Sequence, residues 1–452
     1  MSDTTRTLVI VSQQYPPDKS GHASRISDVA SNLSKMEWDV EVLAPPPCFP
    51  HGEFDRDWYR THRRTTEGVT VRRLWAWQPT EADPGTLSRL AYYVTFAVHA
   101  FLWLAVTRRE HDLVVTTTPP ISTGLVGFVA AASNTPWVTD VRDLWIDASV
   151  SLGFIPEGGI LERGSRRFQH RVLHTADAIA VTTETLGERL CDQYGPTLAE
   201  KLVPVPNGVD IGEFASADPA DSSDRSERVD RSDRPAVVYV GNIGHAQALD
   251  TCVRAMGRMK RDAELHLIGG GDAVPDLREV AARPGIEDRV EFIGPVPNEE
   301  VPALLASAEI GLAPLLDDPE LAYAMPTKLY EYMGAGLPVV TTGRGEIERF
   351  VDESGGGVHV PADPDAVAAA IDRLLADDDR RRRIGAAGQA HVSPTYDREA
   401  ITERFDEQLR HLVEAGDTTL DSGATFHRNV ADGGADARRG DADAGTRERG
   451  NE

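Results

Sequence analysis

Residues 325–341 have the sequence Met-Pro-Thr-Lys-Leu-Tyr-Glu-Tyr-Met-Gly-Ala-Gly-Leu-Pro-Val-Val-Thr, which predicts a short helix, a glycine turn and a buried strand. Pro326 suits the first helical position, and a helix start offers free amides and a positive dipole end to an anion. Lys328 in that first turn opposes the dipole, so a bound phosphate would explain its position. Glu331 lies on nearly the same face and is then free to hold a ribose hydroxyl. The alternative is an ordinary amphipathic helix with two solvated charges.

The rest of the chain alternates strand and helix patterns in two series, which predicts the α/β class with two doubly wound parallel sheets. Ligands of such sheets bind beyond the carboxyl ends of the strands. We therefore expect two Rossmann-like domains that face a cleft. The predicted strands are residues 7–11, 40–43, 114–116, 137–139 and 178–181, then 236–240, 264–268, 290–293, 310–313 and 339–341, and the first helix is predicted at about 24–36.

The length of 452 residues is too great for one ordinary core, and the composition suggests where the chain divides. Residues 1–210 and 236–392 are the expected N-terminal and C-terminal domains. Residues 211–235 form an acidic, polar linker, and residues 415–452 have almost no apolar anchors, so we expect both to be disordered. Residues 393–414 are expected to form a C-terminal helix that returns toward the first domain.

The charge balance is strongly acidic, with 72 Asp and Glu against 47 Lys and Arg and a formal net charge of −25. A nucleic-acid partner would require a basic face, so the composition argues against one. Acidic, arginine-rich and lysine-poor chains are typical of salt-loving microbes such as halophilic archaea, where salt screens the self-repulsion. We expect loss of structure or activity at low salt. Lys328 is one of few lysines in the chain, which suits a compact charge approaching a phosphate.

The three cysteines Cys48, Cys191 and Cys252 are widely spaced and suit a reducing cytoplasm, with neither a disulfide framework nor a zinc site. The N-terminal residues lead directly into a predicted strand, and no signal peptide is visible. We therefore expect a cytoplasmic protein, acting at the inner face of the cell membrane if it touches lipid.

Residues 90–106 are nearly all apolar, between Arg89 and the Arg108-Arg109 pair. The stretch is at the short limit for a membrane span, contains His99, and would interrupt a Rossmann domain, so we reject a span. Two alternatives remain open: a buried core helix, or a helix whose aromatic side chains contact a membrane interface.

Residues 325–341 resemble the signature of retaining, GT-B fold glycosyltransferases of family 4. The Pro-Thr-Lys variant resembles a subgroup that transfers N-acetylhexosamines or fucosamine in surface-polysaccharide assembly. Further motifs resemble the family in the same order along residues 6–412. They are Gln14-Tyr15-Pro16-Pro17 up to Arg25, Asp140-Val141-Arg142-Asp143-Leu144-Trp145, Val205-Pro206-Asn207-Gly208-Val209-Asp210 and Gly241-Asn242-Ile243-Gly244.

The resemblance implies that the C-terminal domain binds a nucleotide sugar and the N-terminal domain the acceptor. Lys328 would neutralise the leaving diphosphate as a catalytic residue, and Glu331 would bind the ribose. The chain departs from the wider family at Asn242 and Gln247, which replace a cationic pair, and at Tyr323, which replaces a glutamate. The expected donor-binding residues are Gly21, Arg25, Gly241, Asn242, Gln247, Gly269, Gly270, Tyr323, Pro326, Thr327 and Glu331.

In the first domain, Asp143 follows a predicted strand and is the second candidate catalytic residue, binding acceptor or donor sugar. The alternative for Asp143 is a helix N-cap. Gly21 lies in a loop that can aim amides at the β-phosphate, with His22 next to it. Arg25 either pairs with a carboxylate or reaches the diphosphate.

The resemblance therefore implies sugar transfer from a nucleotide sugar, a UDP-sugar being the expected donor, to a glycan or a polyprenyl- or dolichyl-linked acceptor. No cofactor and no metal ion is expected, because the runs of aspartate in this acidic chain are interpreted as solvated charges and not as metal ligands. Two alternatives stay open on the same fold: a nucleotide-sugar 2-epimerase and a non-catalytic partner protein.

Overall fold

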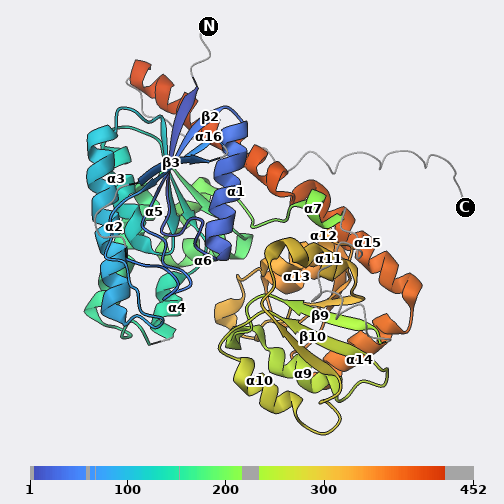
Figure 1. The fold of residues 1–452 in the computed structure, drawn as a ribbon. Helices are drawn as coiled ribbons and strands as arrows, with labels where there is room; N and C mark the ends of the chain where they lie inside the picture. Colours follow the sequence, from blue (N-terminus) through green and yellow to red (C-terminus); the bar gives the residue numbers. More distant parts are fainter. Residues whose placement is uncertain (1–4, 57–61, 67, 152, 216–233, 423–452) are drawn as a thin grey trace, which may run out of the picture.

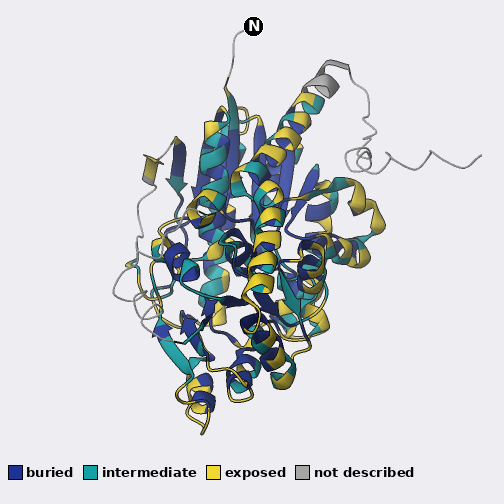
Figure 2. Ribbon diagram, turned by 90° about the vertical axis from the view of Figure 1, so that its right-hand side faces the viewer, coloured by how far each residue is buried: buried dark blue, intermediate teal, exposed yellow. Residues whose placement is uncertain are grey.

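The computed structural model describes residues 5–56, 62–66, 68–151, 153–215 and 234–422. They form two α/β lobes, and the last helix runs from the C-terminal lobe back across the N-terminal one (Figure 1). In Figure 2 the buried strands lie inside, between helices whose outward faces are exposed. The two doubly wound parallel sheets expected from the sequence are confirmed.

The N-terminal sheet has eight strands in the order β3-β4-β2-β1-β5-β6-β7-β8, all parallel except β3. Alternate residues of β1 face opposite cores, Leu8 and Ile10 on one side and Val9 and Val11 on the other. The strands are β1 Arg6–Val11, β2 Trp38–Ala44, β3 His62–Thr66, β4 Val69–Arg73, β5 Leu113–Thr118, β6 Trp137–Val141, β7 Ala178–Val181 and β8 Leu202–Pro204.

Helices cover both faces of this sheet. One core joins it to α1 and α16, and the other joins it to α2, α3 and α5. The first helix starts at Gly21 rather than near Ser24, because the Ser20 hydroxyl caps it by accepting from the Ala23 amide. The helices of this lobe are α1 Gly21–Lys35, α2 Thr86–Thr107, α3 Gly124–Ala132, α4 Trp145–Ser151, α5 Ile160–Thr175 and α6 Glu184–Tyr194.

The C-terminal sheet has six parallel strands in the order β11-β10-β9-β12-β13-β14. Each of the five predicted strands is present, and the prediction missed only the short edge strand β14 here. The hairpin β3–β4 and the strand β8 were missed in the first sheet, where polar and short segments give a weak pattern. The strands are β9 Ala236–Val240, β10 Glu264–Ile268, β11 Val290–Gly294, β12 Ile310–Leu312, β13 Val339–Thr341 and β14 Gly357–His359.

The helices of the C-terminal lobe also form two layers. One core includes α9, α10 and α14, and the other includes α7, α11, α12 and α13. The helices of this lobe are α7 Ile211–Ala215, α9 Leu249–Met256, α10 Val274–Ala281, α11 Val301–Ala306, α12 Thr327–Gly334, α13 Glu346–Ser354, α14 Pro364–Leu375 and α15 Asp378–Thr395. The last helix, α16 Arg398–Ser422, packs on the N-terminal sheet.

The chain passes between the lobes twice, and the two passages are paired. The Val209 amide donates to the Tyr396 carbonyl at 2.9 Å, and the Arg398 amide donates to the Val209 carbonyl at 3.0 Å. Gly208 has a φ of 64°, and a Cβ there would stand 2.5 Å from Ile401 Cδ1. Only glycine therefore fits this close approach of the two passages.

Two expectations about disorder are partly wrong. Residues 211–215 form α7, because Phe214 is buried in the C-terminal core. The C-terminal helix begins at Arg398, after α15 ends at Thr395, and α16 continues through Ser422 into the segment expected to be disordered. The remaining parts of those segments, 216–233 and 423–452, lie outside the described residues.

The apolar segment at 90–106 lies within α2, which has one face in the core, as the first alternative expected, and one exposed face. Tyr92, Phe96 and Leu104 are buried in the core of the N-terminal lobe. Leu102 and Val106 are 57% and 85% exposed on the other face. By length and composition alone, α2 could cross a membrane, but its inner face packs on the sheet.

Candidate active site

The Lys328 ammonium lies over the carboxyl end of β9. Its Nζ is 3.8 Å from the ring centroid of Tyr239 and donates to the Tyr239 hydroxyl. A Cβ on Gly241 would stand 3.5 Å from this Nζ, so the lysine borders the turn after β9. Burial lowers the pKa of Lys328 to about 7, against the opposing effect of Glu331. The ammonium is therefore held at the strand end, without a carboxylate in ion-pair contact among the described residues.

The turns after β9 and β10 are built from glycine because their backbones touch. Gly269 has a φ of 137°, and a Cβ there would stand 1.9 Å from the Gly241 carbonyl oxygen. The Gly241 amide donates to the Ile268 carbonyl at 2.9 Å, and the Ile243 amide donates to the Gly270 carbonyl at 2.9 Å. The Gly241 turn thus packs against the Gly269–Gly270 turn, and Lys328 borders it at Gly241.

Two polar residues of the turn after β9 differ in whether their side chains are already hydrogen-bonded within the protein. The Gln247 side chain accepts from the Gly244 amide at 3.0 Å, so its carbonyl oxygen shapes the turn. Asn242 is exposed, and its backbone carbonyl accepts from the Tyr239 hydroxyl. Asn242 can therefore offer its side chain to a ligand, whereas the Gln247 oxygen is already used.

The start of α12 provides backbone donors next to Lys328. The helix begins at Thr327, so Pro326 is the N-cap rather than the first helical residue that the sequence predicted. Its ψ of 127° is extended, which places the proline just outside the helix. The first amides of a helix have no intrahelical acceptor, so those of Thr327 and Lys328 suit an anion.

Glu331 follows Lys328 by one turn of α12 and is half-buried. Burial raises the pKa of the Glu331 carboxyl, while Arg398 and Lys328 act to lower it. Its neighbours place it near both the lysine and the passage between the lobes. This position suits a polar contact with a ligand that reaches Lys328.

Tyr323 lies where the two lobes touch. Its hydroxyl accepts from the Leu144 amide at 3.3 Å, and its carbonyl accepts from the Thr183 hydroxyl at 3.0 Å. Burial raises the pKa of Tyr323 to about 12, and the nearby Asp143 charge adds to that rise. The contacts show Tyr323 joining the lobes, a role that sequence reasoning, which placed it at the donor sugar, did not foresee.

In the N-terminal lobe, His22 lies at the ends of β1 and β5, next to Gly21. Its Nε2 is 3.1 Å from both the Ser12 and Thr117 hydroxyls. Burial, Arg142 and Arg25 lower the pKa of His22 well below its usual value, so the ring is neutral. A Cβ on Gly21 would meet open space, which leaves the start of α1 accessible.

Arg25 was predicted either to pair with a carboxylate or to reach the diphosphate, and the structure shows the carboxylate pair. It donates to the carbonyls of Val205 and Pro206 at 2.8 and 2.6 Å, and it pairs with Asp140 at 3.4 Å. The side chain is buried beneath the passage between the lobes. Its donors are therefore largely engaged, and it holds the passage against α1 and β6.

Asp143 follows β6 and faces the same edge. Burial raises the pKa of its carboxyl to about 6, against the lowering effects of Arg142 and the Trp145 amide. The Trp145 contact supports the helix-cap alternative, but the buried Oδ1 has no partner among the described residues. One oxygen can thus serve the start of α4 while the other remains available to a ligand.

Sequence reasoning missed Arg142 and Tyr239. Arg142 donates to Asn207 at 3.2 Å, but its buried Nε and Nη1 have no partner within the described chain. Burial and Arg25 lower the pKa of Arg142 to about 10. Arg142 lies next to Asp143 within the quoted motif, so the motif could have pointed to it. Tyr239 lies two residues before the Gly241 motif and outside it.

Metal binding has no support among the described residues, where no cluster of three or more His, Cys, Asp or Glu side chains could hold an ion. In the N-terminal lobe, Arg142 and Asp143 have buried polar atoms without a partner among the described residues, and in the C-terminal lobe Lys328 lies at the end of β9.

Two family models match the two lobes in turn. "Glycosyl transferase 4-like domain" covers residues 20–208, and "Glycosyl transferases group 1" covers residues 234–377. The first range covers strands β2 to β8 of the N-terminal sheet, and the second covers all six strands of the C-terminal sheet.

Two curated relatives and one solved structure illustrate the likeness. A putative colanic acid biosynthesis glycosyl transferase of Escherichia coli is 23% identical over 89% of this chain and 99% of its own. A GDP-mannose-dependent alpha-(1-6)-phosphatidylinositol monomannoside mannosyltransferase of Mycolicibacterium smegmatis is 31% identical over 56% of this chain and 66% of its own. The structure of Alr3699/HepE from Anabaena with UDP has a TM-score of 0.67 and 16% identity, over 90% of this chain and 100% of that one.

Proposed function

Since this chain is a glycosyltransferase with the GT-B fold, we propose that it transfers a sugar from a UDP-sugar to a lipid-linked acceptor in cell-surface glycan assembly. The observation that carries the proposal is the Lys328 ammonium, held beside the Gly241 turn and the start of α12. Neither an epimerase nor a non-catalytic partner is favoured by the similar proteins, which are named as glycosyltransferases.

The reaction needs negative charge to be stabilised on the departing diphosphate. Lys328 and the first amides of α12 would bind this group, with Glu331 at the ribose and the Gly269–Gly270 backbone at the base. With retention of configuration, the leaving phosphate oxygen takes the acceptor proton on the same face of the sugar. No group beyond the nucleotide sugar is required, and the absence of a metal requirement remains a prediction.

The N-terminal lobe would position the acceptor. The free Oδ1 of Asp143 can accept a hydrogen bond from a sugar hydroxyl, and the free edge of Arg142 can bind a phosphate. Both residues lie at the carboxyl edge of their sheet, where ligands of doubly wound folds bind. The proposed donor sugar is an N-acetylhexosamine or a derivative, as the Pro-Thr-Lys motif of the resembling subgroup suggests.

A lipid-linked acceptor is supported by the outer face of α2 and by the phosphatidylinositol mannoside named for one relative. The exposed apolar side chains of α2 would rest on the membrane surface. Leu102→Glu should reduce flotation with vesicles of archaeal or bacterial lipids, whereas Glu110→Gln near the helix end should not. Equal flotation of all three proteins would remove membrane contact from the proposal.

A donor screen tests the function directly. The purified protein is incubated with UDP-, GDP- and dTDP-linked sugars, with and without a lipid extract as acceptor, and nucleotide release is measured. We expect release from a UDP-N-acetylhexosamine that the extract accelerates. Epimerised donor formed without acceptor, or no turnover of any donor, would contradict the proposal.

Salt dependence is also expected, because a formal charge of −25 repels itself in dilute buffer. Activity and the unfolding midpoint should both rise with potassium chloride concentration. Full activity without added salt would contradict the proposed halophilic adaptation while leaving the transferase assignment intact.

A further inference from the structure

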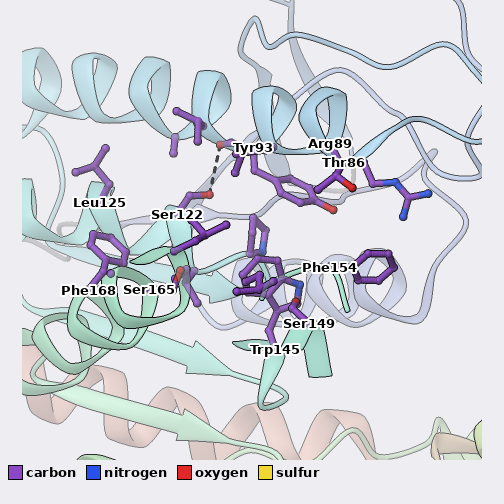
Figure 3. A pocket seen from close by; sticks show the side chains of 18 of the residues that line it. Thr86, Arg89, Tyr93, Ser122, Leu125, Trp145, Ser149, Phe154, Ser165 and Phe168 are labelled. Carbon is purple, nitrogen blue, oxygen red and sulfur yellow. Dashed lines mark hydrogen bonds between the residues drawn. The ribbon is translucent and has the colours of Figure 1, made fainter. Parts of the chain in front are cut away.

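A cavity of about 780 Å³ lies in the N-terminal lobe, between α2, α4 and α5. Figure 3 shows α2 passing above it, with Trp145 and Ser149 of α4 and Phe168 of α5 below. Its walls are mostly apolar, and its volume is in the range of small-molecule sites. One lining residue, Trp145, also contacts Asp143 of the polar edge through its backbone amide.

Some of the polar groups that line the cavity are bonded within the protein. The Ser122 hydroxyl donates to the Tyr93 carbonyl at 3.3 Å, as the dashed line in Figure 3 marks. Arg89, at the rim, donates to the Pro84 carbonyl and pairs with the exposed Asp83 at 3.0 Å. The interior therefore offers dispersion contacts, and the rim offers one cation.

The rim continues the exposed apolar face of the lobe. Leu90, Val94 and Val98 of α2 line the cavity and are 40–45% exposed. Phe154 and Ile160, on the other rim, are 51% and 91% exposed. Apolar groups gathered around an apolar opening mark a binding surface rather than the scattered exposure of an ordinary monomer.

The cavity is also connected to the candidate site by α4. Trp145 lines the cavity, and the Trp145 amide serves Asp143 two residues earlier. The cavity wall at Trp145 is thus two residues along the chain from Asp143.

We propose that this cavity holds the first isoprene units of a prenyl-phosphate-linked acceptor and thereby presents its phosphate and sugar to Asp143. The inference deepens the proposed function by assigning the site that recognises the lipid. An isoprenoid chain matches the apolar walls, the opening onto the exposed face of α2 admits it from a bilayer, and the rim cation suits its phosphate.

Gly164 allows the cavity to be filled without disturbing the fold. It lines the cavity from α5, and no heavy atom lies within 4 Å of the position of an added Cβ. Gly164→Trp should therefore occupy the space where the chain would lie. His170→Trp is the matched control, because His170 is exposed on the same helix and does not line the cavity.

The test is calorimetric binding of farnesyl monophosphate, inorganic phosphate and UDP to the full chain at high salt. The wild type should bind farnesyl monophosphate more tightly than phosphate. Gly164→Trp should weaken this binding at least about tenfold, since losing two buried methylene contacts already has that effect. His170→Trp should bind it as the wild type does, and UDP should bind all three proteins equally.

Each outcome decides a different claim. Farnesyl monophosphate binding that Gly164→Trp leaves unchanged, or no binding beyond that of phosphate, overturns the cavity assignment. A wild-type dimer that Gly164→Trp converts to monomers, with no farnesyl binding, shows a second copy on this face and also overturns it. Failure of UDP to bind the wild type refutes the proposed function instead.

Discussion

The Lys328 site in the C-terminal lobe holds a charged group, whereas the cavity in the N-terminal lobe encloses a mostly apolar space. Around Lys328, a short segment holds one charge at a strand end, and burial brings its pKa to about 7. The cavity is formed by helices α2, α4 and α5 from separate parts of the chain, and its walls are mostly apolar. The comparison teaches that charge recognition can be encoded locally, whereas a space for a chain-like ligand must be assembled.

The largest expected effect concerns the charge. Lys328→Ala removes the cation that would stabilise the departing diphosphate, so kcat should fall about 10²-fold or more, as for the loss of one such electrostatic contact. Steady-state kinetics with the donor found by the screen measures this effect. A kcat near that of the wild type would show that the Lys328 charge does not stabilise the departing diphosphate.

Lys328→Arg is the matched control for that experiment. It keeps the charge but cannot place a compact ammonium over Tyr239, where Nζ is 3.8 Å from the ring centroid. An intermediate kcat is expected. An arginine variant as slow as the alanine variant would point to shape rather than charge.

The next largest effect concerns the Asp143 carboxylate. Asp143→Asn should reduce kcat/KM for the acceptor about 10²-fold if the ionised group positions the reacting hydroxyl. Because burial raises the pKa of Asp143 to about 6, wild-type kcat/KM should fall as pH drops through that value. The variant should lose this acid limb. An unchanged limb in the variant would assign it to another group.

A smaller effect should appear in nucleotide binding. Lys328 has a pKa of about 7 in the free protein, and a bound diphosphate favours its charged form, so binding takes up a proton above that pH. The Kd for UDP should therefore rise as pH increases above 7, by at most about tenfold per unit. Calorimetry across this range measures it, and Lys328→Met should give a flatter profile. Identical profiles would exclude Lys328 from the diphosphate site.

The smallest effect concerns the contact between the lobes. Tyr323→Phe removes the hydroxyl that accepts from the Leu144 amide at 3.3 Å. We expect about 1 kcal/mol of lost stability, typical of one hydrogen bond, and a modest change in the donor KM. Denaturant unfolding and kinetics measure both. A loss of kcat as large as that of Lys328→Ala would place the Tyr323 hydroxyl in the reaction itself.

Much of the fold follows from local patterns. Runs such as residues 236–240 and 264–268 gave their strands with the observed bounds, because buried parallel strands are continuous apolar stretches. The hairpin β3–β4 was not predicted, since residues 62–66 are polar and form an edge strand that pairs with β4. The predicted disorder at residues 211–215 was wrong because burial of Phe214 depends on a distant core.

The candidate site divides in the same way. The sequence by itself determined the two sheets, the glycine turn at Gly241 and the unusual lysine at the start of α12, because these depend on neighbours along the chain. Only the tertiary structure decided that Arg25 supports the passage between the lobes, that Tyr323 joins them, and that α2 has one buried and one exposed apolar face. Those roles depend on which distant groups each side chain meets, and no local pattern carries that information.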